Sequence, residues 1–66
     1  MKVYVNNKEV EIAQQSTITQ LTRSLQLPDK GVAIAVNNKM TPKTEWDNYA
    51  LQENDHIVII KAACGG

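Results

Sequence analysis

Apolar and polar residues alternate along the first part of the chain, with one short interruption. Val3 and Val5 alternate with Lys2 and Tyr4, and the same period returns after the Asn6-Asn7 pair. A period of two is typical of strands that bury one face, and Asn tolerates the positive φ angles of a tight turn better than most residues. The beginning of the chain therefore predicts a β-hairpin, whose turn type stays open because the break contains no Gly.

A helical spacing replaces this alternation in the next segment. Thr17 and Gln20 have the spacing of a capping box, in which each satisfies an otherwise unpaired amide at the start of a helix. Pro28 disfavours helical geometry at the residue before it, so the helix is expected to end near Gln26. Such a short helix must pack on a sheet to be stable. The predicted apolar stripe consists of Ile18, Leu21 and Leu25.

The second half of the chain predicts three more strands. The apolar run 32–36 is typical of a strand inside a sheet, 39–41 can form only a brief edge strand after a second Asn pair, and 56–61 is the last strand. Pro42 is expected at the first position of a short helical turn capped by Thr41. The aromatic pair after it is expected to cover one end of the core, and consists of Trp46 and Tyr49.

The order of these elements predicts an α+β fold, with a mixed sheet of four to five strands packed on one helix. The domain is expected to span residues 1–61. The last strand is apolar on both faces, so its register is a choice. With the register chosen here, eight apolar side chains face the helix: Val3, Val5, Val10, Ile12, Ile34, Val36, Ile57 and Ile59. The opposite face then carries Tyr4, Ala33, Ala35, Val58 and Ile60. Apolar patches of this kind are often partner surfaces, and we expect Tyr4, Val58 and Ile60 to contact a partner.

Composition excludes several classes of function. The 7 Lys and Arg residues cancel the 7 Asp and Glu residues, whereas binding to nucleic acid or an acidic membrane needs a positive excess. A single Cys and a single His can form neither an internal disulfide nor a four-ligand zinc site, and His56 is interpreted as an ordinary residue at the start of its strand. No apolar run approaches the ~20 residues of a membrane span. We expect a cytoplasmic protein.

The last five residues, 62–66, predict a flexible tail that ends in Gly65-Gly66. Glycine has no Cβ and adopts almost any backbone conformation. Such a tail could enter a narrow channel and present the unhindered Gly66 carboxylate to a catalytic centre; the alternative is a frayed end without function. Cys64 is expected to contact the partner together with Gly65. Its thiol could attack an activated acyl group or form a mixed disulfide, but it is interpreted as a small neutral residue, because the tail contains no cation that would lower the pKa of the thiol.

The whole chain resembles the ThiS family, the small ubiquitin-like sulfur carriers of the thiazole branch of thiamine biosynthesis. The resemblance depends on the element order, the Thr41-Pro42-Lys43 segment before Trp46, the Asn54-Asp55 corner, the apolar last strand and the terminal Gly pair. Two positions depart from the family pattern. Asn54 replaces a frequent Gly, which Asn can mimic at positive φ, and Lys43 replaces a frequent Arg, which keeps the charge but loses the bidentate geometry.

The resemblance implies a β-grasp fold and a carrier that is a substrate of other enzymes, is monomeric when free and binds no cofactor itself. An E1-like (ThiF-like) adenylyltransferase would bind the apolar sheet face and Gly65, use Mg²⁺ and ATP of its own, and adenylate the Gly66 carboxylate. A persulfide sulfur donor and reduction would leave a thiocarboxylate, and a ThiG-like thiazole synthase would take the sulfur. The small subunit of molybdopterin synthase and a ubiquitin-like protein modifier stay open as alternatives.

Overall fold

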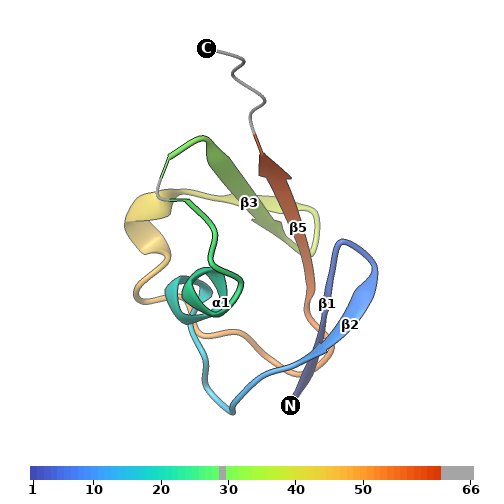
Figure 1. The fold of residues 1–66 in the computed structure, drawn as a ribbon. Helices are drawn as coiled ribbons and strands as arrows, with labels where there is room; N and C mark the ends of the chain where they lie inside the picture. The colour runs from blue at the N-terminus through green and yellow to red at the C-terminus, as the bar shows by residue number, and fades with distance from the viewer. Residues whose placement is uncertain (29, 62–66) are drawn as a thin grey trace.

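The computed structural model describes residues 1–28 and 30–61. Its five strands form one mixed sheet in the order β2-β1-β5-β3-β4, in which β1 and β5 are parallel and the other neighbours antiparallel. The helix α1 covers one face of this sheet (Figure 1). The elements are β1 (Lys2–Val5), β2 (Lys8–Glu11), α1 (Ile18–Ser24), β3 (Val32–Val36), β4 (Lys39–Thr41), the short 3-10 helix η1 (Lys43–Glu45) and β5 (His56–Lys61). The predicted α+β architecture and element order are confirmed.

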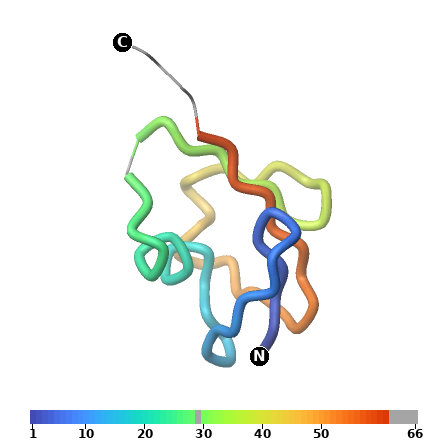
Figure 2. Tube along the Cα trace, turned by 45° about the vertical axis from the view of Figure 1, so that its right-hand side comes forward, coloured from blue at the N-terminus to red at the C-terminus, as the bar shows by residue number. Residues whose placement is uncertain are grey.

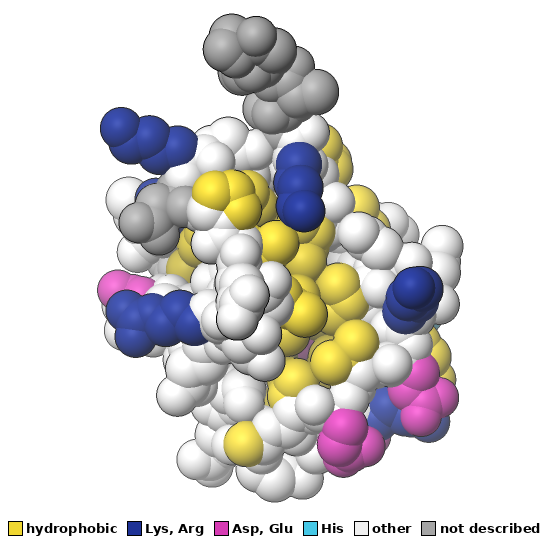
Figure 3. All heavy atoms as spheres, viewed as in Figure 1, with side chains coloured by type: hydrophobic (Ala, Val, Ile, Leu, Met, Phe, Trp, Pro, Cys, Tyr) yellow, Lys and Arg dark blue, Asp and Glu magenta, His cyan; other side chains and the backbone are white. Residues whose placement is uncertain are grey.

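The predicted sides of the sheet are also confirmed. The core lies between the sheet and α1, and Figure 3 shows a band of hydrophobic side chains along the seam between them. Val10, Ile12 and Ile59 are only partly buried at its margin. One small residue differs from the simple picture, because Ala35 lies on the opposite face and is nevertheless buried by its neighbours. The buried core consists of Val3, Val5, Ile18, Leu21, Ile34, Val36, Trp46, Leu51 and Ile57.

Both hairpins close with two-residue turns. Asn6 and Asn7 have φ angles of 51° and 69°, and Asn37 and Asn38 have φ angles of 53° and 71°. Positive φ at both central positions is the requirement of a type I′ turn, which matches the twist of the flanking strands. The Asn pairs therefore fix the registers of both hairpins, and the turn type that the sequence left open is resolved.

The helix begins as predicted. The Thr17 hydroxyl accepts a hydrogen bond from the Gln20 amide at 3.2 Å, and the Thr17 amide donates to Gln20 Oε1 at 2.8 Å. These two bonds complete the capping box and satisfy two amides that the helix itself cannot pair.

The helix ends earlier than predicted and for a different reason. Its last residue is Ser24, and Gln26 adopts a left-handed conformation with φ 58°. The Gln26 amide donates to Arg23 O and the Leu27 amide to Thr22 O, both at 3.0 Å, which is the hydrogen-bond pattern of a Schellman motif. Because this motif terminates the helix before Pro28 can act, proline is not the cause of the helix end.

Replacement of Gln26 by Gly is expected to stabilise the protein by about 0.5–1 kcal/mol. A side chain with a Cβ pays a steric cost in the left-handed region that Gly avoids, and this cost exceeds the extra entropy that Gly loses on folding. Thermal unfolding should show a melting temperature higher by several degrees. Arg23→Gly is the matched control within the helix, and it should lower the melting temperature because Gly is a poor helix former. Equal destabilisation by both variants would contradict the argument.

The segment after β4 closes one end of the core. Trp46 is 6% exposed, and its indole Nε1 donates a hydrogen bond to Thr41 O at 3.0 Å. The prediction that this residue covers one end of the core is therefore confirmed. Tyr49, the second residue of the predicted aromatic pair, packs against the same cluster. The prediction for the helical turn was wrong by one residue. η1 begins at Lys43, Pro42 is its N-cap with extended backbone, and no side chain caps it.

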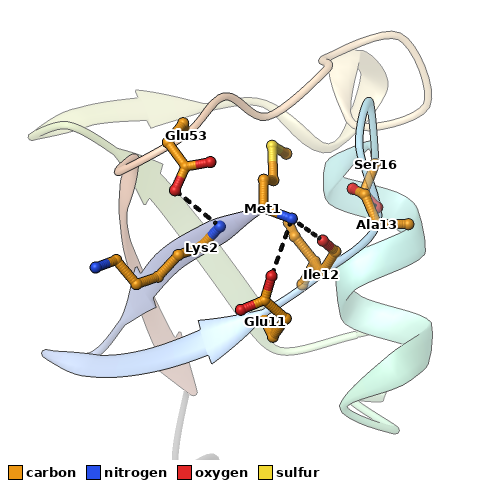
Figure 4. A network of polar contacts seen from close by, with 7 residues as sticks. All are labelled: Met1, Lys2, Glu11, Ile12, Ala13, Ser16 and Glu53. Atoms are coloured by element: carbon orange, nitrogen blue, oxygen red, sulfur yellow. Dashed lines mark hydrogen bonds and ion pairs between the residues drawn. The ribbon is translucent and has the colours of Figure 1, made fainter.

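The first residue is tied to the end of β2 (Figure 4). The Met1 amino group donates to Ile12 O at 2.6 Å and pairs with Glu11 Oε2 at 3.1 Å, while the Lys2 amide donates to Glu53 Oε2 at 3.1 Å. These contacts fix the beginning of β1 between two neighbouring segments. β5 ends on the opposite side of the molecule from Met1 (Figures 1 and 2). Within the described residues, no helix has the length and apolar character needed to cross a membrane.

Candidate functional site

The face of the sheet opposite α1 carries an apolar surface that we name the outer patch. Strand pairing places Val58 opposite Ala35, and Ile60 opposite Ala33, so these side chains share one face. Val58 is 41% exposed and Ile60 51% exposed, whereas Ile57, which faces the helix from the same strand, is 1% exposed. The outer patch consists of Ala33, Ala35, Met40, Val58 and Ile60.

Met40 was missing from the sequence-based site, although it is the most exposed large apolar side chain of the outer patch at 59%. It pairs with Ala35 and therefore extends the patch onto the edge strand β4. The signal was present in the sequence. A two-residue turn at Asn37-Asn38 fixes the register of β4, and alternation then places Met40 on the face opposite Thr41.

A polar and aromatic group borders the outer patch on the side of β1. The Tyr4 and His56 rings are stacked, with centroids 4.8 Å apart and an angle of 18° between their planes. The Lys2 ammonium lies 5.7 Å from the centroid of the Tyr4 ring. The neighbouring Tyr4 side chain raises the pKa of Lys2, and the charges of Glu9 and Glu53 act in the same direction. Tyr4 thus lies beside the patch, and its ring is partly covered by His56.

β5 positions the predicted reactive end of the chain. This strand is the middle one of the sheet, and its last residue, Lys61, pairs with Val32 of β3. The predicted site residues Cys64, Gly65 and Gly66 lie outside the described residues, as does the whole predicted tail 62–66. Their roles stay predictions. The residue that precedes this segment, Lys61, lies at the end of the strand that carries Val58 and Ile60.

The described residues contain no metal centre. No three His, Cys, Asp or Glu side chains among them are grouped so that they could hold a metal ion. A groove of about 230 Å³ between α1 and the segment after η1 is lined by Thr19, Arg23, Leu27, Trp46 and Asp47, among others. The Thr19 hydroxyl donates to the Asp47 carboxylate across this groove, so part of its polar surface is already paired.

The model of the ThiS family matches residues 2–66, which is nearly the whole chain. The chain belongs to the ThiS family. A relative in the same family, the sulfur carrier protein ThiS of Escherichia coli (strain K12), is 26% identical over 66 residues and covers 100% of both chains.

A solved structure supports the fold. The crystal structure of the thiamine biosynthesis protein ThiS from Geobacter metallireducens matches with a TM-score of 0.85 and 20% sequence identity, and the match covers 100% of each chain. At this identity the likeness concerns the fold alone. It confirms the ubiquitin-like β-grasp architecture of this family member, with five strands on one helix.

Proposed function

We propose that this protein is a sulfur carrier of thiamine biosynthesis whose Gly66 carboxylate is the reacting group. The observation that carries the proposal is the family match over residues 2–66, which includes both the outer patch and the terminal Gly pair. The full-length likeness to the ThiS protein of Escherichia coli supports the same function. In this proposal the protein is not an enzyme but a co-substrate of partner enzymes.

The chemistry begins with activation of the carboxylate. The Gly66 carboxylate attacks the α-phosphate of ATP, pyrophosphate leaves, and an acyl-adenylate forms in the active site of an E1-like adenylyltransferase. The sulfur of a persulfide donor then attacks the acyl carbon and displaces AMP. A thiol reduces the resulting acyl disulfide, which leaves a thiocarboxylate on Gly66 and an oxidised disulfide on the donor side. ATP and Mg²⁺ belong to the adenylyltransferase, and a thiazole synthase takes the sulfur.

The outer patch supplies the surface on which these partners dock. Exposed Val58, Ile60 and Met40 give it apolar area that water solvates poorly, and burial against a partner removes that cost. Gly65 lacks a side chain and can pass through a narrow entrance to the partner's active site. Cytoplasmic ATP and reduced thiols fit this chemistry, and we place the protein in that compartment.

Intact-mass spectrometry tests the proposed function directly. After incubation with the adenylyltransferase, ATP, Mg²⁺, a persulfide donor and a thiol, the protein should gain about 16 Da, because one oxygen of its terminal carboxylate is replaced by sulfur. Omission of ATP is the control and should leave the mass unchanged. Addition of a thiazole synthase with its other substrates should return the mass to its original value. An unchanged mass with an adenylyltransferase that is active on another carrier would contradict the proposal.

A further inference from the structure

β5 is longer than the strand that pairs with it on one of its two sides. On the side of β3, every residue from Ile57 to Lys61 has a partner. On the side of β1, pairing ends at Val5 and Ile57, because the chain then turns away into the first hairpin (Figure 1). The second half of β5 therefore has no neighbouring strand on this side. We name residues 59–61 along this side the open edge.

Hydrogen bonds at the beginning of β5 show which of its backbone groups point toward the open edge. The Asn6 amide donates to Ile57 O at 2.9 Å on the side of β1, and the Asn37 amide donates to His56 O at 2.7 Å on the side of β3. The backbone groups of successive residues in a strand point alternately to its two sides. The odd-numbered residues of β5 therefore direct their N–H and C=O groups toward β1, and those of Lys61 point to the open edge.

The Asn6 side chain occupies the first position of the open edge. Its Oδ1 accepts from the Ile59 amide at 2.8 Å, and its Nδ2 donates to Ile59 O at 3.4 Å. A carboxamide that bonds to both backbone groups of one residue takes the place of a peptide group in a neighbouring strand. Among residues 1–28 and 30–61, none does the same for Lys61, whose N–H and C=O have no partner at the open edge. Pairing thus ends one step before the end of β5.

The open edge is accessible and continuous with the outer patch. Lys61 is exposed, and Ile60, which belongs to the patch, is 51% exposed. Unpaired N–H and C=O groups at the side of a strand are a template for pairing with another chain. An extended segment that binds in this way gains main-chain hydrogen bonds, and its side chains contact the neighbouring surface. Ile60 supplies such a surface directly beside the unpaired groups of Lys61.

A second copy of this chain is a poor occupant of the open edge. If two copies paired antiparallel through both backbone groups of Lys61, their two Lys61 side chains would lie directly opposite each other. Like charges in this arrangement destabilise a strand pair. Lysine on an exposed edge is also a common means by which proteins prevent self-association. The open edge therefore favours a strand from a different protein.

We infer that the open edge pairs with an extended segment of the adenylyltransferase that docks on the outer patch, and that this segment bonds to the N–H and C=O of Lys61. The inference rests on the proposed function and specifies how the partner orients the end of the chain. Apolar contacts alone permit sliding, whereas a strand pair on a half-buried surface has a defined register. Gly66 is five residues beyond Lys61, so an extended chain spans at most about 17 Å from the strand pair to the carboxylate.

Amide hydrogen exchange tests the inference directly. In the free protein, the Lys61 amide should exchange as an unpaired amide does, whereas the Ile60 amide, which points toward β3, should be protected and serves as the internal control. In the complex with the adenylyltransferase, exchange at Lys61 should slow at least about tenfold, because one hydrogen bond has formed. Fast exchange at Lys61 in a complex that forms normally would overturn the inference. Protection of Lys61 in the free protein would overturn it as well.

Proline at position 61 removes the amide without removing a hydrogen bond of the domain. Because this amide points to the open edge, Lys61→Pro breaks no bond to β3, and a residue before Pro keeps the extended conformation that β5 requires. The melting temperature should stay within about 4 °C of the wild-type value. The affinity for the adenylyltransferase, measured by calorimetry, should nevertheless fall at least about tenfold.

Lys61→Ala is the matched control for the proline variant. It removes the charged side chain but keeps the amide, so its affinity should stay within about threefold of the wild type. Equal weakening by both variants would assign the contact to the lysine charge and overturn the inference, as would wild-type affinity of the Pro variant. Unfolding of the Pro variant would show that the amide is already bonded within the domain. A wild-type protein that neither binds the adenylyltransferase nor gains mass would instead contradict the proposed function.

Discussion

Deletion of Gly66 is expected to abolish thiocarboxylate formation and to leave the melting temperature unchanged within about 1 °C. The variant still ends in a glycine carboxylate, that of Gly65, but this carboxylate lies about 3.5 Å short of the original position. A displacement of only 1 Å can cost about a hundredfold in rate when a reacting group must meet a fixed catalytic centre. Intact-mass spectrometry measures the loss of the sulfur product, and thermal unfolding measures stability.

An extension by one residue is the matched control for this deletion. A protein with one additional Gly after Gly66 keeps the same chemistry at its end and displaces the carboxylate in the opposite direction. It should also fail to gain mass. A deletion variant that still accepts sulfur would show that the position of the terminal carboxylate is not critical. A deletion variant that loses stability would show that Gly66 has a structural role.

Introduction of a charge into the outer patch should have the second largest effect. Val58→Asp is expected to weaken binding to the adenylyltransferase at least about a hundredfold, equivalent to about 2.7 kcal/mol, because the carboxylate would be buried against an apolar surface without a partner. Val58 is 41% exposed in the free protein, so the fold should tolerate the change at a cost of about 1 kcal/mol. Calorimetric titration and thermal unfolding measure the two effects separately.

Leu25→Asp is the matched control for this substitution. Leu25 is 37% exposed, a value close to that of Val58, but it is the C-cap of α1 and lies on the other side of the sheet. It should bind as the wild type does. Equal weakening by both variants would indicate a nonspecific effect of charge. Unfolding of the Val58→Asp protein would contradict the exposed position of this side chain.

Alternation predicted the two faces of the first hairpin. The last strand is apolar on both faces, so alternation did not determine its register, and Ile57 was assigned to the helix side as a choice; the structure confirms that choice, with Ile57 buried and Val58 exposed. Local sequence signals did not predict the end of the helix, where two of them compete. Pro28 predicted the end of the helix, but Gln26 ends it earlier, since the hydrogen bonds of the Schellman motif outweigh the poor fit of Gln to positive φ. A Gly would have indicated a Schellman motif, but this segment contains none, and no other residue type in it indicates one.

Contacts between segments that are distant in the sequence could not be predicted from sequence patterns. The stacking of Tyr4 on His56 depends on the parallel pairing of β1 with β5, which joins the two ends of the domain. Periodicity describes each strand by itself and does not state which strands are neighbours. The cleft lined by Asn7 and Asn38 was not predicted for the same reason, although the repeated Val-Asn-Asn-Lys sequence at residues 5–8 and 36–39 was visible. Two identical turns acquire a common surface only after β5 is inserted between their hairpins.

The central place of β5 has a mechanical consequence. A partner that draws the end of the chain into a channel pulls along this strand, which pairs with β3 on one side and with β1 on the other. Force along the strand direction loads the hydrogen bonds of both ladders in shear, so they must break together rather than one after another. The Asn37 side chain adds a hydrogen bond at His56, the first residue of β5, and the Asn6 side chain adds one at Ile59. We therefore expect the domain to stay folded while a partner pulls on the end of its chain.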